Sequence, residues 1–148
     1  GSSKMRIIFM TTNKGWAHFS AEQQIRGEYQ LSFSGRVMTE KELKTNGVNM
    51  QQVYEIARMQ SAKEKKFKLT LTSDERSNEF RCTNHSCAPN CLIVATFSST
   101  HGNMLHGFAM FTRRNMEAYE EYTIDYFNPG VCFMFRPCLC DTYACRGL

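Results

Sequence analysis

Seven cysteines constrain this chain of 148 residues more than any other feature of its sequence. They are Cys82, Cys87, Cys91, Cys132, Cys138, Cys140 and Cys145, so they crowd towards one end. An odd number argues against a complete disulfide framework. One residue separates Cys138 from Cys140, a spacing that lets two thiolates face one ion but closes a poor disulfide loop. The pattern favours a bound metal and a reducing intracellular compartment.

The length suits one domain and is sufficient to bury an ordinary hydrophobic core. Apolar residues make up 42% of the chain and charged residues 22%, which is typical of a globular protein rather than a disordered one. The longest apolar runs are far too short to span a membrane, so we expect no membrane segment. Residues 1–3 (GSS) resemble a cloning remnant and no signal peptide follows them, so we expect a piece of a longer protein.

The net charge of +4 is mildly basic. Most of the excess lies between Arg58 and Lys68, where Glu64 is the single acidic residue. Two interpretations stay open for this basic stretch. It is either a solvated helix end with a loop, or a patch that contacts DNA or an acidic partner.

Hydrophobic patterning predicts many short strands. Alternating or apolar runs indicate strands at 6–10, 16–19, 29–34, 67–72 and 122–126, and a hairpin of 91–97 with 104–111. Helices are fewer. Thr39 and Glu42 have the spacing of a capping box, which predicts a short helix ending near Asn46. A second helix is expected after Asn49, because Met50, Val53, Tyr54 and Ala57 recur at helical spacing. The sum is a mostly β or α+β domain.

Three segments, in order, carry a resemblance to a known family. They are Arg81–Cys91 (RCTNHSCAPNC), Glu120–Tyr126 (EEYTIDY), and the terminal Cys138-Leu139-Cys140 with Cys145. Together they resemble the signature of SET-domain protein lysine methyltransferases. The resemblance implies a SET fold of several small sheets, in which the first two segments cross like a pseudoknot. It divides the chain into a SET domain at 4–127 and a zinc-bound post-SET segment at 128–148, after the remnant at 1–3.

The resemblance implies a zinc site at the end of the chain. Cys138, Cys140 and Cys145 match the post-SET cysteines, and Cys87 is the implied fourth ligand, with Cys91 as its competitor. Four thiolates close a tetrahedral shell and leave no open position, so the zinc would be structural rather than catalytic. We expect the remaining two cysteines, Cys82 and Cys132, to be buried or unpaired thiols.

S-adenosylmethionine is the implied methyl donor. The positions that match the family's cofactor contacts are Gly15, Trp16 and Ala17 on one segment, and Arg81, Asn84 and His85 on another. In the first segment, glycine lets the backbone approach a ligand closely. Ala17 stands where the family has its second glycine.

Tyr126 matches the family's terminal tyrosine and is the implied catalytic residue, with a hydroxyl that orients the lysine amine. Direct displacement needs nucleophile, carbon and leaving sulfur in line, and positioning supplies about 7–11 kcal/mol in favourable cases. Phe33, Phe67 and Ile124 match positions of the substrate channel. Because the family uses an aromatic residue at the Ile124 position to tune methyl number, the sequence does not predict how many methyl groups are added.

Several positions depart from the family pattern. Phe33 replaces a tyrosine, and Tyr119 replaces a glycine, so we expect a different turn before Glu120. These departures leave a second interpretation open, that of a weak or inactive SET module serving as a chromatin-associated peptide-binding scaffold. A third, a zinc-stapled nucleic-acid module, is disfavoured by the modest charge.

The resemblance also implies a partner and a location. Most members modify histone tails in the nucleus, so we expect a histone tail or another lysine-containing peptide, with a weak nucleosomal DNA contact. Glu117, Glu120 and Glu121 either line an acidic groove for a basic tail or form a solvated turn. The target lysine and the oligomeric state do not follow from the sequence.

Overall fold

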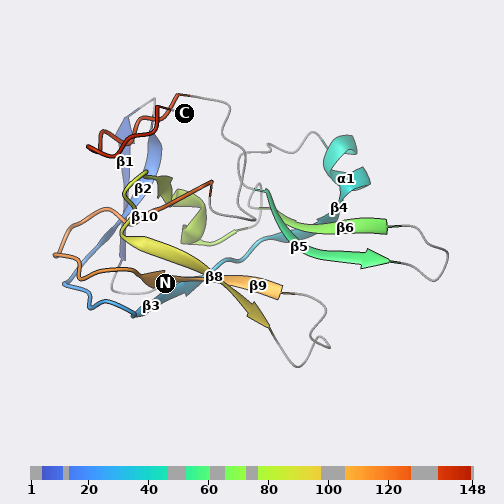
Figure 1. The fold of residues 1–148 in the computed structure, drawn as a ribbon, viewed down its shortest axis with the longest axis horizontal. Coiled ribbons are helices and arrows are strands. Elements are labelled where there is room, and N and C mark those ends of the chain that lie inside the picture. Colours follow the sequence, from blue (N-terminus) through green and yellow to red (C-terminus); the bar gives the residue numbers. More distant parts are fainter. Residues whose placement is uncertain are drawn as a thin grey trace.

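The computed structural model describes residues 5–11, 14–46, 53–60, 66–72, 77–97, 106–127 and 137–147 (Figure 1). Strands dominate these ranges, and they form four small sheets. β1 (Met5–Thr11) pairs antiparallel with β2 (Gly15–Ser20). The second sheet has the order β3 (Tyr29–Ser32), β9 (His106–Thr112), β8 (Cys91–Phe97), and is antiparallel.

The third sheet has the order β4 (Arg36–Thr39), β6 (Lys66–Thr72), β5 (Val53–Gln60), also antiparallel. The fourth is a parallel pair of β7 (Asn84–His85) and β10 (Thr123–Ile124). Helical structure in the described ranges includes α1 (Glu40–Thr45) and the 3₁₀-helix η2 (Glu79–Cys82), and no helix there is long and apolar enough to cross a bilayer. The result is the mostly β, multi-sheet architecture expected from the sequence.

Figure 1 shows how these pieces are arranged. The β1–β2 hairpin lies beside the C-terminal segment at one end of the molecule, while α1 and the β4–β6–β5 sheet lie at the opposite end. β10 runs near β2, at the end of the molecule where the C-terminus lies. This arrangement gathers the segments of the sequence signature at one end of the molecule.

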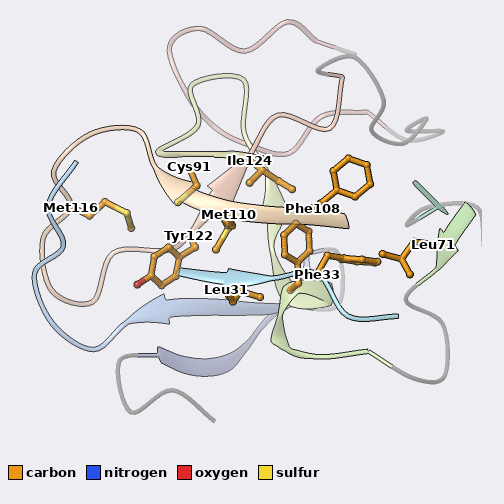
Figure 2. Packing of buried hydrophobic residues seen from close by; sticks show 10 residues of the cluster. Leu31, Phe33, Leu71, Cys91, Phe108, Met110, Met116, Tyr122 and Ile124 are labelled. Carbon is orange, nitrogen blue, oxygen red and sulfur yellow. The ribbon is translucent and has the colours of Figure 1, made fainter. Parts of the chain in front are cut away.

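The hydrophobic core lies between the sheets, and its side chains come from strands, from η2 and from connecting segments that are far apart in the sequence (Figure 2). Met110 and Tyr122 are fully buried at its centre. The Tyr122 hydroxyl donates to Oε1 of Gln30 at 3.0 Å, and Nε2 of Gln30 donates to Oε1 of Gln24 at 3.1 Å. Because each polar group has a partner, this buried network avoids the cost of an unpaired polar atom. Leu31, Phe33, Leu71, Phe80, Cys91, Phe108, Met116 and Ile124 complete the buried cluster.

The capping box and the hairpin are confirmed. Thr39 Oγ1 accepts from the Glu42 amide at 3.3 Å, and Glu42 Oε2 accepts from the Thr39 amide at 2.8 Å, which starts α1. β8 and β9 pair from Cys91 with Thr112 to Phe97 with His106. The predicted residues 104 and 105 lie outside the described ranges.

The second predicted helix is wrong. Val53, Tyr54 and Ala57 lie in β5, which pairs with β6. The pairing shifts register between Glu55 and Ala57, so the period of two that marks a strand is broken there and helical spacing appears instead. Asn49 and Met50 lie outside the described residues. The basic stretch therefore does not begin at a helix end, because Arg58 is a strand residue.

Strand lengths also differ from expectation. The run predicted at 29–34 ends at Ser32, and β4 follows it without having been predicted. Gly35 stands between them because a Cβ there would lie 2.1 Å from the carbonyl oxygen of Thr72. The run predicted at 122–126 shortens to β10, because the amide of Tyr126 donates to a side chain instead of a strand.

The turn before Glu120 keeps a glycine-like backbone although its residue is tyrosine. Tyr119 has a φ of 65°, in the left-handed region, and its amide donates to Ser20 O at 2.9 Å. Its side chain is 74% exposed, so no burial compensates for the backbone conformation. Tyr119 therefore adopts a left-handed backbone that is strained for any residue with a side chain and that glycine adopts at little cost. Whether the turn differs from that of the family stays a prediction.

Replacing Tyr119 with glycine is expected to stabilise the protein by about 0.5–1 kcal/mol. Glycine removes the left-handed backbone penalty of about 1–2 kcal/mol. The greater entropy that glycine gives the unfolded chain offsets about 0.5–1 kcal/mol of this gain. Urea denaturation of wild type and Tyr119→Gly measures the difference. Tyr119→Ala is the matched control, since it removes the exposed ring but keeps Cβ. Equal stabilisation by both variants would contradict the backbone explanation.

Candidate active site and metal centre

A short parallel pairing brings two distant segments together. Asn84 lies opposite Thr123 and His85 opposite Ile124, and the amide of Ser86 donates to Ile124 O at 2.9 Å. These are the first two signature segments of the sequence. The expected crossing is therefore present in the fold.

The side chain of Asn90 holds the crossing from within. It is 2% exposed, its Nδ2 donates to Glu121 O at 2.7 Å and to Glu120 Oε1 at 3.0 Å, and its Oδ1 accepts from the Thr123 amide at 2.8 Å. Glu120 also accepts from Arg114. Burial alone would raise the pKa of Glu120, but the hydrogen bonds from Arg114 and Asn90 outweigh burial and lower it. Asn90 thus ties the two signature segments together with every polar atom of its side chain used.

The acidic residues proposed for a substrate groove have structural partners. Glu120 binds Arg114 and Asn90, and Glu121 Oε1 accepts from Asn84 Nδ2 at 2.8 Å. Glu117 is exposed, and its carbonyl accepts from Ser20 Oγ at 2.9 Å. Of the three residues, Glu117 is the exposed one, whereas Glu120 and Glu121 are half-buried.

Tyr126 is fixed at both ends. Its amide donates to Nδ1 of His85 at 3.1 Å, although 41 residues separate the two in sequence. Its hydroxyl donates to the carbonyl oxygen of Thr83 at 2.5 Å. The rings of Tyr126 and His85 lie 5.4 Å apart. The candidate catalytic phenol is therefore held against the first signature segment.

His85 is neutral in this setting. Because Nδ1 accepts a backbone hydrogen bond, the ring proton is assigned to Nε2, which lies 3.3 Å from Cys87 Sγ. Burial lowers the pKa of His85, and Asp125 opposes that shift only in part. His85 thus links the Tyr126 backbone on one side to a cysteine on the other.

Four cysteines form a cluster. The sulfur atoms of Cys87, Cys138, Cys140 and Cys145 all lie within 4.8 Å of one another. Cys87 Sγ and Cys138 Sγ are 3.7 Å apart, close to the edge of about 3.8 Å in a tetrahedron with Zn–S bonds of about 2.3 Å. The donor set and its size therefore fit a structural zinc ion.

The electrostatics of the cluster also favour a cation. Burial raises the pKa of the Cys138 thiol to about 12. At Cys140 the hydrogen bonds, led by one from Thr142, outweigh burial and lower the pKa to about 6. One thiolate therefore forms readily while its neighbour resists a second negative charge. A divalent cation would remove that repulsion and deprotonate both thiols.

Two further cysteines in the described ranges, Cys82 and Cys91, do not belong to this cluster. Cys91, the competitor for Cys87, is 1% exposed in the hydrophobic core, and burial raises the pKa of its thiol to about 12. Cys82 is half-buried in η2, and burial raises the pKa of its thiol as well. Cys132 lies outside the described residues. The geometry thus favours Cys87 over Cys91 as the fourth ligand.

Charged contacts attach the C-terminal segment to the crossing. The guanidinium of Arg146 donates to Asp125 Oδ1 at 2.6 Å and lies 5.3 Å from the centre of the Phe127 ring. Burial opposes ionisation of Asp125, but the hydrogen bond from Arg146 and the amide of Phe127 give its pKa a net downward shift. Lys14 Nζ approaches Asp141 at 3.8 Å from the β2 side. The C-terminal segment, residues 137–147, therefore contacts Asp125 and Phe127 on either side of Tyr126, and Lys14 at the start of β2.

The Gly-Trp segment adjoins the same place. Asn84 Nδ2 donates to Trp16 O at 3.3 Å. Gly15 has a φ of 75°, and a Cβ there would meet nothing within 4 Å, so the space over the backbone is open. Ala17 is fully buried, so its methyl group does not occupy the open side. Arg81 is exposed on η2, which packs against β2. The six residues matched to the cofactor site thus lie on neighbouring elements.

The three channel candidates are placed unequally. Phe33 packs edge-on against Phe80 with ring centres 4.9 Å apart, and Ile124 is 1% exposed. Both belong to the cluster against which Tyr126 packs. Phe67 lies in β6 opposite Met59, and its side chain is outside the described part of the structure. Phe33 and Ile124 are therefore core side chains of the apolar cluster that Tyr126 joins at its edge.

One polar residue near the site escaped the sequence interpretation. His18 is fully buried in β2, and its Nε2 lies 3.2 Å from Thr83 Oγ1. Its ring meets Tyr122 edge-on at 4.9 Å, and among the described residues its Nδ1 has no hydrogen-bond partner. Burial lowers its pKa to about 4. No signal in the sequence indicated this contact, because His18 is one position of a short predicted strand and its partner Thr83 is 65 residues away.

The comparisons with known proteins agree with this geometry. The model of the SET-domain family matches residues 15–127. This chain belongs to the SET-domain family. It is 33% identical over 144 residues to the histone-lysine N-methyltransferase ash1 of Drosophila melanogaster, covering 95% of this chain and 6% of that protein. It is 30% identical over 149 residues to the probable histone-lysine N-methyltransferase set-23 of Caenorhabditis briggsae, covering 99% and 61%.

Solved SET-domain structures have the same fold. One, from a study of the product specificity of histone lysine methyltransferases, has a TM-score of 0.76 at 24% identity, covering 97% of this chain and 55% of that one. The methyltransferase domain of human SETMAR has a TM-score of 0.75 at 18% identity, covering 97% and 56%. The chain thus spans less than two thirds of these curated relatives and solved chains.

Zinc content tests the ligand set. Wild-type protein is expected to hold one zinc ion per chain, measured by inductively coupled plasma mass spectrometry after dialysis. Cys87→Ser is expected to weaken binding so that a mild chelator removes the ion, because three thiolates and a hydroxyl hold zinc less tightly. Cys91→Ala is the matched control and should retain the metal. Loss of zinc from Cys91→Ala but not from Cys87→Ser would reverse the assignment.

His18 is expected to make the protein sensitive to acid. The pKa of His18 is 6.5 in the unfolded chain and about 4 in the folded protein. Between these two values the unfolded chain binds a proton that the folded protein does not bind, so the free energy of unfolding decreases as the pH falls from 6.5 to about 4. The loss amounts to about 3 kcal/mol. His18→Leu should remove this part of the pH dependence of the free energy of unfolding. Parallel profiles for wild type and variant would contradict the buried, neutral imidazole.

Proposed function

We propose that this chain is an S-adenosylmethionine-dependent protein lysine N-methyltransferase of the nucleus that acts on a histone tail. The observation that carries the proposal is the position of Tyr126, whose hydroxyl and amide are both held by residues 83–85. The names of its relatives support the substrate class. A weak contact of the basic stretch with nucleosomal DNA is part of the same proposal.

Tyr126 acts by orienting the substrate amine. Its hydroxyl proton is engaged by Thr83 O, so what it offers an incoming amine is a hydrogen-bond acceptor. An acceptor there aligns the nitrogen lone pair for in-line displacement, and alignment is a large part of such a rate. The phenol is thus a positioning and transition-state contact rather than a base.

Proton loss from the lysine is favoured by the surroundings. At neutral pH, deprotonation from a reference pKa of about 10.4 costs roughly 4–5 kcal/mol. Tyr126 packs against the apolar cluster that contains Phe33 and Ile124, and apolar surroundings disfavour the ammonium form. Asp125 is paired with Arg146, and Nδ1 of His85 is occupied by the Tyr126 amide. Neither group is therefore suited to act as general base.

The residues of the Gly-Trp segment fit the methyl donor. S-adenosylmethionine, when bound, supplies an electrophilic methyl on a sulfonium. Gly15 leaves open space above its backbone, and Asn84 fixes the Trp16 carbonyl at the edge of that space. Together with Arg81 and His85 they are the proposed cofactor contacts. Because the Ala17 methyl is buried, the change from glycine does not obstruct them.

Cys87, Cys138, Cys140 and Cys145 are the proposed zinc ligands. The ion would be structural, since four thiolates leave no position for a substrate. Its proposed effect is to keep the residue 137–147 segment beside Asp125 and Lys14. The domain division at residues 127 and 128 belongs to this proposal.

One observation favours the second candidate function, a weak or inactive SET module that binds peptides in chromatin. Phe33 is buried against Phe80 and offers no hydroxyl to a lysine. Such a module would bind the cofactor and histone peptides without measurable transfer. Cofactor binding alone therefore does not distinguish the two functions, whereas methyl transfer does.

Tyr126→Phe is expected to lower kcat at least ~100-fold without unfolding the protein, which is the usual effect of removing a positioned catalytic hydroxyl. Transfer of labelled methyl to histones and nucleosomes measures the rate, and mass spectrometry assigns the lysine and the methyl number. Tyr29→Phe is the control, because its hydroxyl bonds only locally to Ser32 at 3.1 Å.

Two results would count against the proposal. If wild-type protein binds histone peptides but transfers no methyl group to any substrate, the scaffold function replaces the enzymatic one. If wild-type protein is active and Tyr126→Phe retains near-normal turnover, the enzyme stands but the role of Tyr126 is wrong.

A further inference from the structure

His18 is a buried imidazole that the proposed chemistry does not use. It is fully buried in β2, and one of its two ring nitrogens, Nδ1, has no hydrogen-bond partner among the described residues. An unpartnered polar atom inside a protein costs free energy, and leucine would fill a similar volume without that cost. The position is therefore not explained by packing alone.

The other ring nitrogen has a specific contact. Nε2 of His18 lies 3.2 Å from Oγ1 of Thr83, which is itself 1% exposed. The Thr83 amide donates to Phe80 O at 3.0 Å. The side chain and the amide of Thr83 are thus both held from within the protein, and His18 supplies the side-chain contact.

The carbonyl of Thr83 faces the reacting side. It is the acceptor of the Tyr126 hydroxyl, at 2.5 Å. A chain of contacts therefore runs from the His18 ring through Thr83 to the phenol of Tyr126. The direction of the Tyr126 hydroxyl depends on where the Thr83 carbonyl points, and this in turn depends on how the threonine residue is held.

We propose that His18 is a positioning residue for methyl transfer, acting through Thr83 on the hydroxyl of Tyr126. This inference rests on the proposed methyltransferase function and adds to it a residue outside the cofactor and substrate contacts. Without His18, the Thr83 peptide loses its side-chain anchor and the phenol is held in a broader range of directions. Turnover then falls while the substrate still binds.

Variants that keep or remove the hydrogen bond test the proposal. His18→Leu and Thr83→Val remove it, whereas His18→Gln and Thr83→Ser retain a polar partner at the same reach. We expect the first two to lower kcat at least ~10-fold with KM changed less than ~2-fold, because misplacement of a catalytic group affects the reaction more than binding. The two conservative variants should recover most of the activity.

The double variant His18→Leu/Thr83→Val should be no slower than either single variant, because both remove the same contact. Leu43→Ala is the stability control, since Leu43 is buried in α1 at the far end of the molecule. It is expected to lower the melting temperature while leaving kcat unchanged below that temperature. All rates are compared at a temperature at which each variant is folded.

Three outcomes overturn the proposal when wild-type protein is active. They are wild-type kcat in both His18→Leu and Thr83→Val, a loss in Leu43→Ala that matches theirs, and additive losses in the double variant. Wild-type protein without methyl transfer would instead refute the proposed function.

In that case the positioning by His18 is tested by carbon-13 NMR of the Tyr126 ring carbon that bears the hydroxyl. Thr83→Val should shift this resonance and Thr83→Ser should restore it, and an unmoved resonance would overturn the proposal.

Discussion

The parallel pairing of β7 with β10 is the interaction on which the rest of the site depends. It is two residues long on each strand, yet it joins segments about 40 residues apart. Closing so long a loop costs entropy, and two ladder residues do little to offset it. The buried side chain of Asn90 supplies the additional hydrogen bonds that make the crossing stable, and a fully satisfied buried network of this kind also fixes one arrangement.

Several contacts follow from the crossing. It brings Tyr126 to His85, sets Asn84 beside Trp16, and leaves Cys87 on the surface that faces the tail. The tail itself buries little, since Leu139 is 47% exposed and Tyr143 is fully exposed. A segment without a core needs another source of order, and a metal held by four thiols is a sufficient one. The Arg146–Asp125 pair then holds the tail beside the segment after β10 that carries the phenol.

The sequence was informative where chemistry is tied to residue type. The spacing of the three terminal cysteines indicated a metal site, and the family resemblance supplied Cys87 as the fourth member of the cluster. A capping box acts within one helical turn, so α1 was predictable. Periodicity failed at β5, because a register shift between Glu55 and Ala57 imitates helical spacing. It also missed β4, which begins directly after Gly35, where the Thr72 carbonyl lies too close to the backbone to leave room for a Cβ.

Long-range contacts were the least predictable part. Tyr119 stands where the family has a glycine, and its side chain does not favour a left-handed backbone. The hydrogen bond from its amide to Ser20 O nevertheless accompanies a left-handed conformation. His18 has no distinguishing local signal, because its role follows from Thr83, which is 65 residues away. The acidic residues of 120 and 121 resemble a substrate groove in sequence, whereas in the fold they bind Arg114, Asn90 and Asn84.

Amide hydrogen exchange followed by NMR tests the central claim most directly. The amides of Ser86, Thr123 and Tyr126 all donate across the crossing. If the crossing is a single cooperative unit, these three amides are protected together and exchange with a common free energy of opening. Exchange of the Tyr126 amide at the rate of an unstructured peptide, while the β8–β9 amides remain protected, would contradict the account.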